Sequence, residues 1–231
     1  MFYYIKIVAI VSLYILRLID IYSMKFLIAD DHHIVRKGIR KILIEAYPEA
    51  WAEEALTGSE LLRKASSRDW SLIITDITMP GISGLEALKE LKKTAPKIPV
   101  LILSMHAPGE YAFRAIKSGA AGYLTKDSAA EELILAVQTI LKGKRYITSE
   151  VAELIADSCT TSSQFDPLET LTDKEFEIFK LLVSGKKAAA IANNLSIRQS
   201  SIAYYRGNIL QKMHVQSNNE LIRYAIQHNL T

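Results

Sequence analysis

The chain has 231 residues, of which 49% are hydrophobic, and it contains only 10 glycines and 6 prolines. This length predicts two compact domains, and the composition excludes a disordered, collagen-like or loop-rich protein. The net charge is only +3. Cys159 is the single cysteine, so no intramolecular disulfide can form, and we expect a cytoplasmic protein.

Residues 1–23 are strongly apolar, but charged side chains interrupt them. The longest uncharged run has ten residues, from Ile7 to Leu16, whereas a membrane span needs about 20. No small-residue cleavage pattern follows, as a signal peptide would require. We therefore expect an N-terminal extension that is not native, with Met24 as the natural start and no membrane partner. A membrane-associated helix is the alternative.

From Lys25 to Leu141, strand-like apolar runs alternate with amphipathic, helix-like stretches. The strands are expected at KFLIA, WAEEA, SLIIT, PVLIL and GYLT, and the helices at about 34–47, around Leu61 and Leu62, and at 85–93, 111–117 and 131–141. Five such repeats predict an α/β domain over residues 24–142, with a doubly wound, five-stranded parallel sheet. WAEEA is the least strand-like of the five segments.

Polar residues terminate four of these expected strands. Asp30 and Asp31 end the first strand, Asp76 the third and Ser104 the fourth, while Lys126 follows the fifth. The carboxyl ends of parallel strands gather functional groups at one edge of a doubly wound sheet. We therefore expect three acids, a hydroxyl and an ammonium to lie together there.

Three neighbouring carboxylates repel one another unless a cation joins them, and a set of oxygen ligands suits Mg²⁺. A carboxylate beside such a metal can attack a phosphoryl group and form an aspartyl phosphate, with a lysine neutralising the phosphoryl oxygens. Asp76 is the candidate nucleophile. His32 and His33 are interpreted as local polar residues, because Mg²⁺ prefers oxygen.

After Gly143 the pattern becomes purely helical. A helical stretch from Ser149 to Asp157 and the polar break CTTSSQFDP predict a helix and linker over residues 143–166. An all-α domain is then expected over residues 167–231, opening with a capping box of Thr172 and Glu175. Its helices are predicted at about 173–184, 188–194, 199–213 and 217–228. This region holds eight basic and five acidic residues, a mild excess that is compatible with a polyanionic partner.

Residues 24–142 resemble the flavodoxin-like receiver domains of two-component systems, through the acidic pair, DITMPGISG, LSMH and GYLTK. The resemblance implies a sensor histidine kinase as partner, phosphorylation of Asp76, and Mg²⁺ as cofactor. It assigns the metal to Asp30, Asp31, Asp76 and the main-chain carbonyl of Thr78, and the switch to Ser104, Tyr123 and Lys126. Asp127 departs from the proline that many receivers carry after the lysine.

Residues 167–231 resemble the helix-turn-helix domain of LuxR/NarL (FixJ) regulators, through LTDKEFEIFKLLVSGK, IANNLSI and SSIAYYRGNILQKM. The resemblance implies that the helix starting near Gln199 enters the major groove of promoter DNA, bound by a homodimer. The implied DNA contacts are Ser200, Ser201, Tyr204 and Arg206, with Lys186, Lys187 and Lys212 on phosphates.

This family commonly carries polar or charged residues where this chain has the alanine run 188–190. It also commonly has a lysine in place of Ala203 and a histidine in place of Tyr205. These replacements remove phosphate contacts, unless the tyrosines bond phosphates instead. Tyr205 shares a helix face with Ile202 and Ile209, so core packing is its alternative role. The apolar stripe of Leu221, Ile222, Ala225 and Ile226 is either core or a dimer surface.

The sequence therefore predicts a phosphorylation-dependent transcription regulator that is not an enzyme and has no small-molecule substrate. In the expected switch, a phosphoryl group on Asp76 draws Ser104 toward it, and Tyr123 turns inward. One alternative is a receiver that acts through protein contacts, its helical domain having lost DNA affinity. A phosphatase using Asp76 is disfavoured, because Thr78 occupies the position where such an enzyme needs a second acid.

Overall fold

The computed structural model describes residues 24–105, 109–160, 167–228 and 230. The expected N-terminal extension, residues 1–23, lies outside them. No helix within the described segments is both long enough and apolar enough to cross a bilayer.

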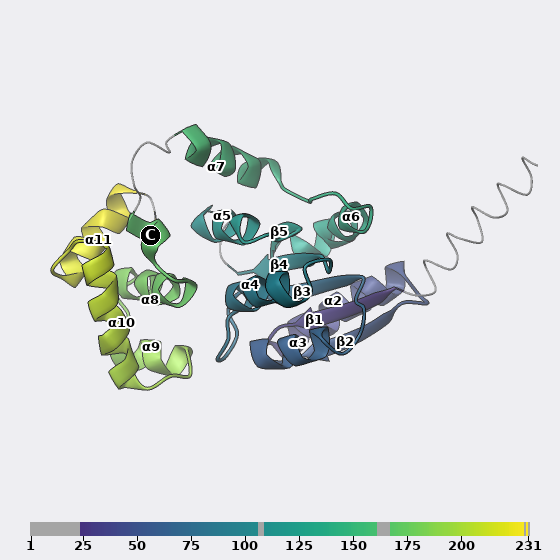
Figure 1. The fold of residues 1–231 in the computed structure, drawn as a ribbon, viewed down its shortest axis with the longest axis horizontal. Helices are drawn as coiled ribbons and strands as arrows, with labels where there is room; N and C mark the ends of the chain where they lie inside the picture. Colours follow the sequence, from purple (N-terminus) through teal and green to yellow (C-terminus); the bar gives the residue numbers. More distant parts are fainter. Residues whose placement is uncertain (1–23, 106–108, 161–166, 229, 231) are drawn as a thin grey trace, which may run out of the picture.

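The first region is a five-stranded parallel sheet in the order β2-β1-β3-β4-β5, covered by helices on both faces (Figure 1). The strands are β1 (Lys25–Ala29), β2 (Trp51–Ala55), β3 (Leu72–Asp76), β4 (Val100–Ser104) and β5 (Gly122–Thr125). The helices are α2 (His33–Ala46), α3 (Gly58–Ala65), α4 (Gly84–Thr94), α5 (Gly109–Lys117) and α6 (Ala129–Leu141). The prediction of a doubly wound α/β fold is confirmed.

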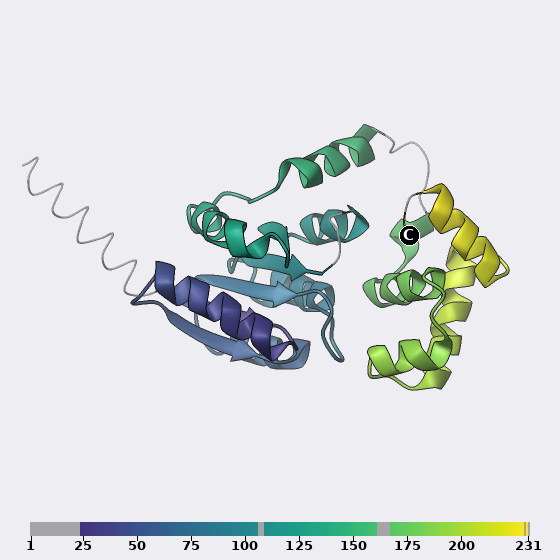
Figure 2. The same cartoon turned by 180° about the vertical axis from the view of Figure 1, so that it is seen from behind.

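Alternation along the strands divides the core into two layers. Phe26, Ile28 and Leu72 pack with α2 and α6 on one face of the sheet, while Leu27 and Ile73 pack with α3, α4 and α5 on the other. Because neighbouring residues of a strand point to opposite faces, each strand supplies both layers. Figure 2 shows the chain from behind, with α2 and α6 over the sheet.

The weakly strand-like segment WAEEA is the edge strand β2, where one side of the ladder has no partner strand. Its acids bind the flanking helices instead of entering the core. Glu54 carboxylate oxygens lie 3.2 Å from Arg36 Nε and 3.1 Å from Lys37 Nζ of α2, and Glu53 Oε1 lies 3.1 Å from Lys64 Nζ of α3. Polar residues are therefore compatible with a strand at this position.

The rest of the described chain is helical: α7 (Ser149–Thr160), the 3-10 helix η1 (Pro167–Thr170), α8 (Asp173–Val183), α9 (Ala188–Asn194), α10 (Gln199–Lys212) and α11 (Asn218–Gln227). The helix expected to end at Asp157 continues to Thr160, so it includes the start of the predicted polar break. The capping box is present at α8: the Thr172 hydroxyl accepts from the Glu175 N–H, and the Glu175 carboxylate accepts from the Thr172 N–H.

One hydrophobic cluster spans the sheet region and the C-terminal helices. Phe176, Ile178 and Phe179 of α8 are completely buried, and they belong to the same cluster as Leu27 and Ile73. Helix α8 also contacts α9, α10 and α11. It therefore forms the centre of the C-terminal helical unit and also packs against the sheet region.

Gly84, the first residue of α4, packs directly on the backbone at the end of β3. A Cβ at this position would lie 1.9 Å from the Asp76 carbonyl oxygen, and the Gly84 N–H donates to the Ile77 carbonyl at 2.8 Å. Only glycine permits this approach of α4 to the segment that carries Asp76.

We predict that Gly84→Ala lowers the free energy of unfolding by about 3 kcal/mol, because the new methyl group forces α4 away from Asp76. Gly38→Ala on α2 is the matched control: its Cβ would have no atom within 4 Å, and alanine favours a helix interior by about 0.5–1 kcal/mol. Urea unfolding measures both changes. Equal effects of the two substitutions would contradict the packing argument.

Candidate functional site

The structure brings two of the predicted acids together with the predicted lysine. Asp30 and Asp76 follow paired positions of the adjacent strands β1 and β3 and are 1% and 3% exposed. The Lys126 ammonium lies 2.6 Å from Asp30 Oδ2 and 2.7 Å from Asp76 Oδ2. A single cation therefore bridges two buried carboxylates, as expected from the common edge of the strands.

Burial sets the protonation of this cluster. It raises the pKa of Asp76 to about 6, against the lowering effects of Lys126 and of the Thr78 N–H, while the neighbouring Asp30 raises it further. Burial opposes the charge of Lys126, but the Asp76 and Asp30 carboxylates outweigh it, so the pKa of this ammonium is raised. At neutral pH Asp76 is therefore mostly ionised beside a charged lysine.

His32 was predicted to be a local polar residue and not a metal ligand, but it lies among the acids. Its main-chain N–H donates to Asp30 Oδ1 at 2.8 Å, and its ring Nδ1 lies 3.2 Å from Asp30 Oδ1 and 2.9 Å from Asp31 Oδ1. Ligand atoms of Asp30, Asp31, His32 and Asp76 all lie within 4.8 Å of one another. His33 is exposed at the start of α2.

Two of the three predicted switch residues, Ser104 and Tyr123, lie on β4 and β5, and Lys126 follows β5. Ser104 is completely buried and follows Leu103, the β4 residue that pairs with Asp76. Tyr123 of β5 is 1% exposed. Their side chains are hydrogen-bonded, and burial raises the pKa of Tyr123 to about 12. The Tyr123 ring is thus already buried in this structure, whereas we expected it to turn inward on phosphorylation.

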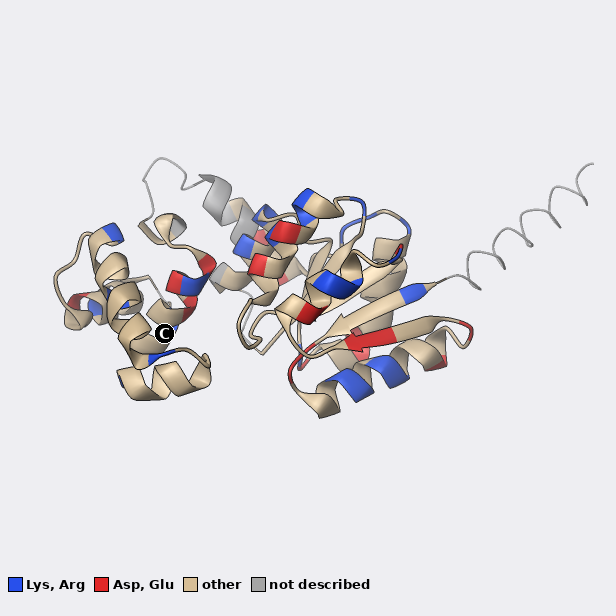
Figure 3. Cartoon of the chain, turned by 60° about the horizontal axis from the view of Figure 1, so that its bottom comes forward, with Lys and Arg blue, Asp and Glu red and all other residues tan. Residues whose placement is uncertain are grey.

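A buried polar contact between the sheet region and the C-terminal helices was not foreseen. Arg114 of α5 donates from Nη1 to the Leu171 carbonyl at 2.9 Å and from Nη2 to the Leu168 carbonyl. Asp173, the first residue of α8, lies 2.7 Å from Lys89 Nζ and 3.7 Å from Arg114 Nη1. Figure 3 shows the charged residues at the start of α8 on the side that faces the sheet region.

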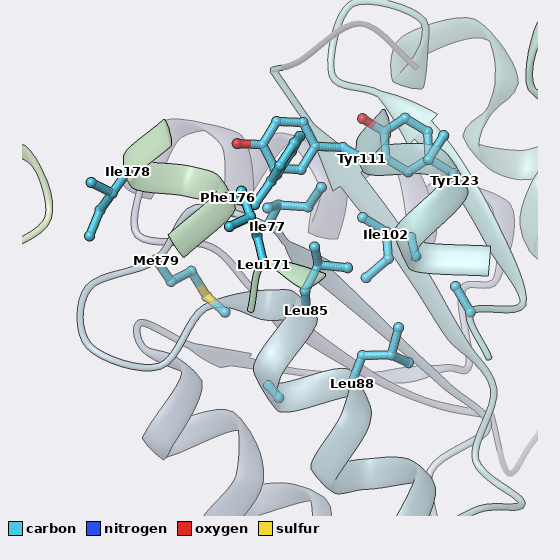
Figure 4. Packing of buried hydrophobic residues seen from close by; sticks show 14 of the residues in the cluster. Ile77, Met79, Leu85, Leu88, Ile102, Tyr111, Tyr123, Leu171, Phe176 and Ile178 are labelled. Atoms are coloured by element: carbon cyan, nitrogen blue, oxygen red, sulfur yellow. The ribbon is translucent and has the colours of Figure 1, made fainter. Parts of the chain in front are cut away.

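Aromatic side chains lie between this polar contact and the switch residues. Tyr111 of α5 and Phe176 of α8 pack edge to face, with ring centroids 5.0 Å apart, and the Arg114 guanidinium lies 4.2 Å from the Phe176 centroid. In Figure 4, Tyr111 lies between Phe176 and Tyr123, and its phenol interacts electrostatically with that of Tyr123. A packed path therefore leads from Ser104 and Tyr123 to the first long helix of the C-terminal region.

The residues predicted to contact DNA differ in how available they are. Ser200, Lys186 and Lys187 are exposed, and Tyr204 on α10 is 67% exposed. The other three are less accessible. Ser201 is half-buried. Arg206 Nε donates to Asn218 Oδ1 at 2.7 Å, and Lys212 Nζ donates to Glu175 Oε2 at 2.6 Å. The exposed residues of α10 are therefore all uncharged.

The structure shows which role Tyr205 and the apolar stripe of α11 take. Tyr205 is half-buried and packs against the core with the buried Ile202 and Ile209, as its alternative role requires. On α11, Leu221 and Ala225 are completely buried, so they are core residues, while Ile226 is 60% exposed. The stripe thus serves the core, and only its outer edge remains available for a partner.

Comparison with known proteins matches both parts of the chain. The family described as "Response regulator receiver domain" matches residues 26–138, and "Bacterial regulatory proteins, luxR family" matches residues 169–225. The oxygen regulatory protein NreC of Staphylococcus epidermidis is 36% identical over 215 residues, covering 90% of this chain and 99% of that protein. The response regulator UvrY of Escherichia coli K12 is 29% identical over 205 residues, covering 88% and 94%.

A solved structure of RcsB from Salmonella enterica serovar Typhimurium, bound to promoter P1flhDC in the presence of the phosphomimetic BeF3⁻, has a TM-score of 0.55 and 26% identity. The alignment covers 87% of this chain and 97% of that one. Fold and site thus define a receiver followed by a helix-turn-helix region. The chain belongs to the response regulators with a LuxR-type DNA-binding domain, and its function is phosphorylation-dependent regulation of transcription.

We predict that Arg114→Ala separates the receiver from the C-terminal helices, because it leaves the Leu168 and Leu171 carbonyls without their donor and removes one of the two cations near Asp173. Leaving the two buried carbonyls unsatisfied costs about 3 kcal/mol in total, which weakens docking roughly a hundredfold. Small-angle X-ray scattering should then give a larger radius of gyration. Arg40→Ala, an exposed position on α2, is the control; identical scattering of the two variants would argue against the contact.

Proposed function

We propose that phosphoryl transfer from a sensor histidine kinase to Asp76 controls the binding of this protein to promoter DNA in the cytoplasm. The proposal assigns the receiver to residues 24–142, the connecting helix and linker to 143–166, and the DNA-binding domain to 167–231. The observation that carries it is the Lys126 ammonium, which lies within 2.7 Å of both Asp30 and Asp76. No small-molecule substrate is part of this function.

In the proposed transfer, an ionised Asp76 oxygen forms a bond to phosphorus while the bond between phosphorus and the kinase histidine nitrogen breaks. The imidazole leaves with the electron pair of that bond. Asp76 is available for this attack because its pKa of about 6 leaves it mostly ionised at neutral pH. Lys126, now 2.7 Å from Asp76, then pairs with the phosphoryl oxygens.

The donor set of the acidic cluster fits a hard cation. Its carboxylates belong to Asp30, Asp31 and Asp76, and the buried Asp30 Oδ2 has no hydrogen bond of good geometry although Lys126 lies nearby. With the Thr78 main-chain carbonyl they would hold Mg²⁺. When bound, Mg²⁺ neutralises charge on the phosphoryl oxygens.

We propose that the path through Ser104, Tyr123 and Tyr111 couples Asp76 to α8. A phosphoryl group adds nearly two negative charges and strong hydrogen-bond acceptors beside Ser104. If Ser104 bonds to it, the hydroxyl of Tyr123 loses its present partner, and the packing of Tyr111 against Phe176 changes with it. Helix α5 carries both Tyr111 and Arg114, so this change reaches the contacts that hold α8.

For DNA binding, α10 would enter the major groove with Ser200, Ser201, Tyr204 and Arg206 near bases, and Lys186, Lys187 and Lys212 near phosphates. Lys212 can do so only by leaving Glu175. A homodimer formed around Ile226 of α11 would add a second half-site and raise affinity without stronger individual contacts.

The alternative of a receiver that works through protein contacts has one observation in its favour. Ala188, Ala189 and Ala190 are all exposed at the start of α9, where family members commonly carry polar or charged residues. Alanine side chains cannot bond to phosphates.

To test the function, protein beginning at Met24 is used to select genomic DNA fragments at physiological salt, with and without beryllofluoride and Mg²⁺. We expect a paired half-site motif whose enrichment increases with beryllofluoride. Asp76→Ala should lose this increase, because the proposed phosphoryl site is absent. No enrichment in any state would favour the protein-contact alternative.

Ser104→Ala tests the coupling separately from the chemistry. We expect this variant to accept a phosphoryl group from acetyl phosphate at nearly the wild-type rate, because Asp76 and Lys126 are unchanged. Its DNA affinity should respond to phosphorylation at least tenfold less, since the hydroxyl that senses the phosphoryl group is missing. Phosphate-affinity electrophoresis and DNA titration measure the two properties, and normal activation of this variant would contradict the path through Ser104.

A further inference from the structure

An open cavity of about 570 Å³ lies on the receiver, at the edge of the sheet opposite to Asp76. Its walls come from the residues that precede β3, β4 and β5, from the carboxyl-terminal ends of α4 and α6, and from residues 143–145 that follow α6. Small-molecule sites in proteins commonly occupy 300–1,000 Å³. The acidic cluster, by contrast, lies at the carboxyl ends of the same strands, so the two sites do not share residues.

Four cationic side chains line this cavity: Lys92, Lys97, Lys144 and Arg145. No acidic residue is among the lining residues, and none of the four cations forms an ion pair with any residue that the structure describes. The Lys92 ammonium donates only to a main-chain carbonyl, that of Ile98, at 3.0 Å.

This cluster differs from the cations that pair with acids in the receiver. Elsewhere in it, Lys37, Lys64 and Lys126 each lie within 3.1 Å of a carboxylate. Around the cavity, burial and the neighbouring Arg145 both lower the pKa of Lys92. The positive charges there repel one another, and no acidic side chain relieves the repulsion.

Helix dipoles do not account for the cluster. The carboxyl-terminal end of a helix carries roughly half a negative charge, which favours nearby lysines and arginines. Two such ends, those of α4 and α6, together offset about one unit of positive charge. Four cations line the cavity, so most of their charge is left for an external anion.

We propose that this cavity binds a polyanionic, phosphate-bearing ligand. Lysine binds phosphate as a point charge, and arginine adds paired N–H donors that match phosphate oxygens. The number of cations favours a ligand with at least two negative charges, such as a diphosphate group. A soluble diphosphate and a lipid head group offer the same chemistry, and the experiment separates these sources.

Isothermal titration calorimetry of the full chain with pyrophosphate, and separately with ADP, tests the proposal in buffer with EDTA. We expect binding of one ligand per chain, weakened at least tenfold by the triple substitution Lys97→Gln, Lys144→Gln and Arg145→Gln. These three side chains are exposed, so the variant should fold. Arg40→Gln, Lys41→Gln and Lys93→Gln remove the same charge from exposed positions that do not line the cavity, and this control should bind like the wild type.

Sedimentation with vesicles of phosphatidylcholine and cardiolipin identifies the source. Binding to vesicles that depends on the three cavity residues, and that pyrophosphate displaces, assigns a lipid head group. Binding of the soluble probes without vesicle binding assigns a free diphosphate compound. Saturable binding to neither kind of probe, or equal loss in the cavity variant and its control, overturns the proposal.

Discussion

The bridge that Lys126 forms between Asp30 and Asp76 is the constraint on which the rest of the receiver depends. Two carboxylates buried at neighbouring strand ends would repel each other strongly without a cation. The lysine comes from the end of β5, so the bridge requires the whole order of strands to be correct. Glycine at position 84 keeps the next helix against the same segment. Sheet, helix and charge thus fix one another around the acid that we propose as the nucleophile.

Helix α8 shows how a short segment connects two functions. Two acids in its first turn contact different parts of the protein: Asp173 contacts Lys89 and Arg114 of the receiver, whereas Glu175 caps the helix and binds Lys212 of α10. Phe176, the residue after Glu175, packs against Tyr111. A shift of α8 relative to the receiver therefore also alters the environment of the helix proposed to read DNA. Buried charged contacts of this kind are strongly weakened when one partner moves.

Much of the fold and of the acidic site was predictable because both depend on local patterns. Alternating strands and helices defined the sheet, and the polar residues at four strand ends converged without further assumption. The capping box at Thr172 was likewise predicted from four consecutive residues. Even WAEEA was correctly expected as a strand, although only the structure shows that its acids pair with the helices beside it.

The sequence by itself determined which groups meet at the carboxyl edge of the sheet, because strand direction fixes that edge. Only the tertiary structure decided that Arg114 would hold the C-terminal helices, since its partners are main-chain carbonyls 54 and 57 residues away. Carbonyls carry no residue-specific signal, and an exposed arginine and a docking arginine look alike in one sequence. The cluster of cations at the opposite edge has the same origin: Lys92 and Arg145 are far apart in the chain, and folding brings them together.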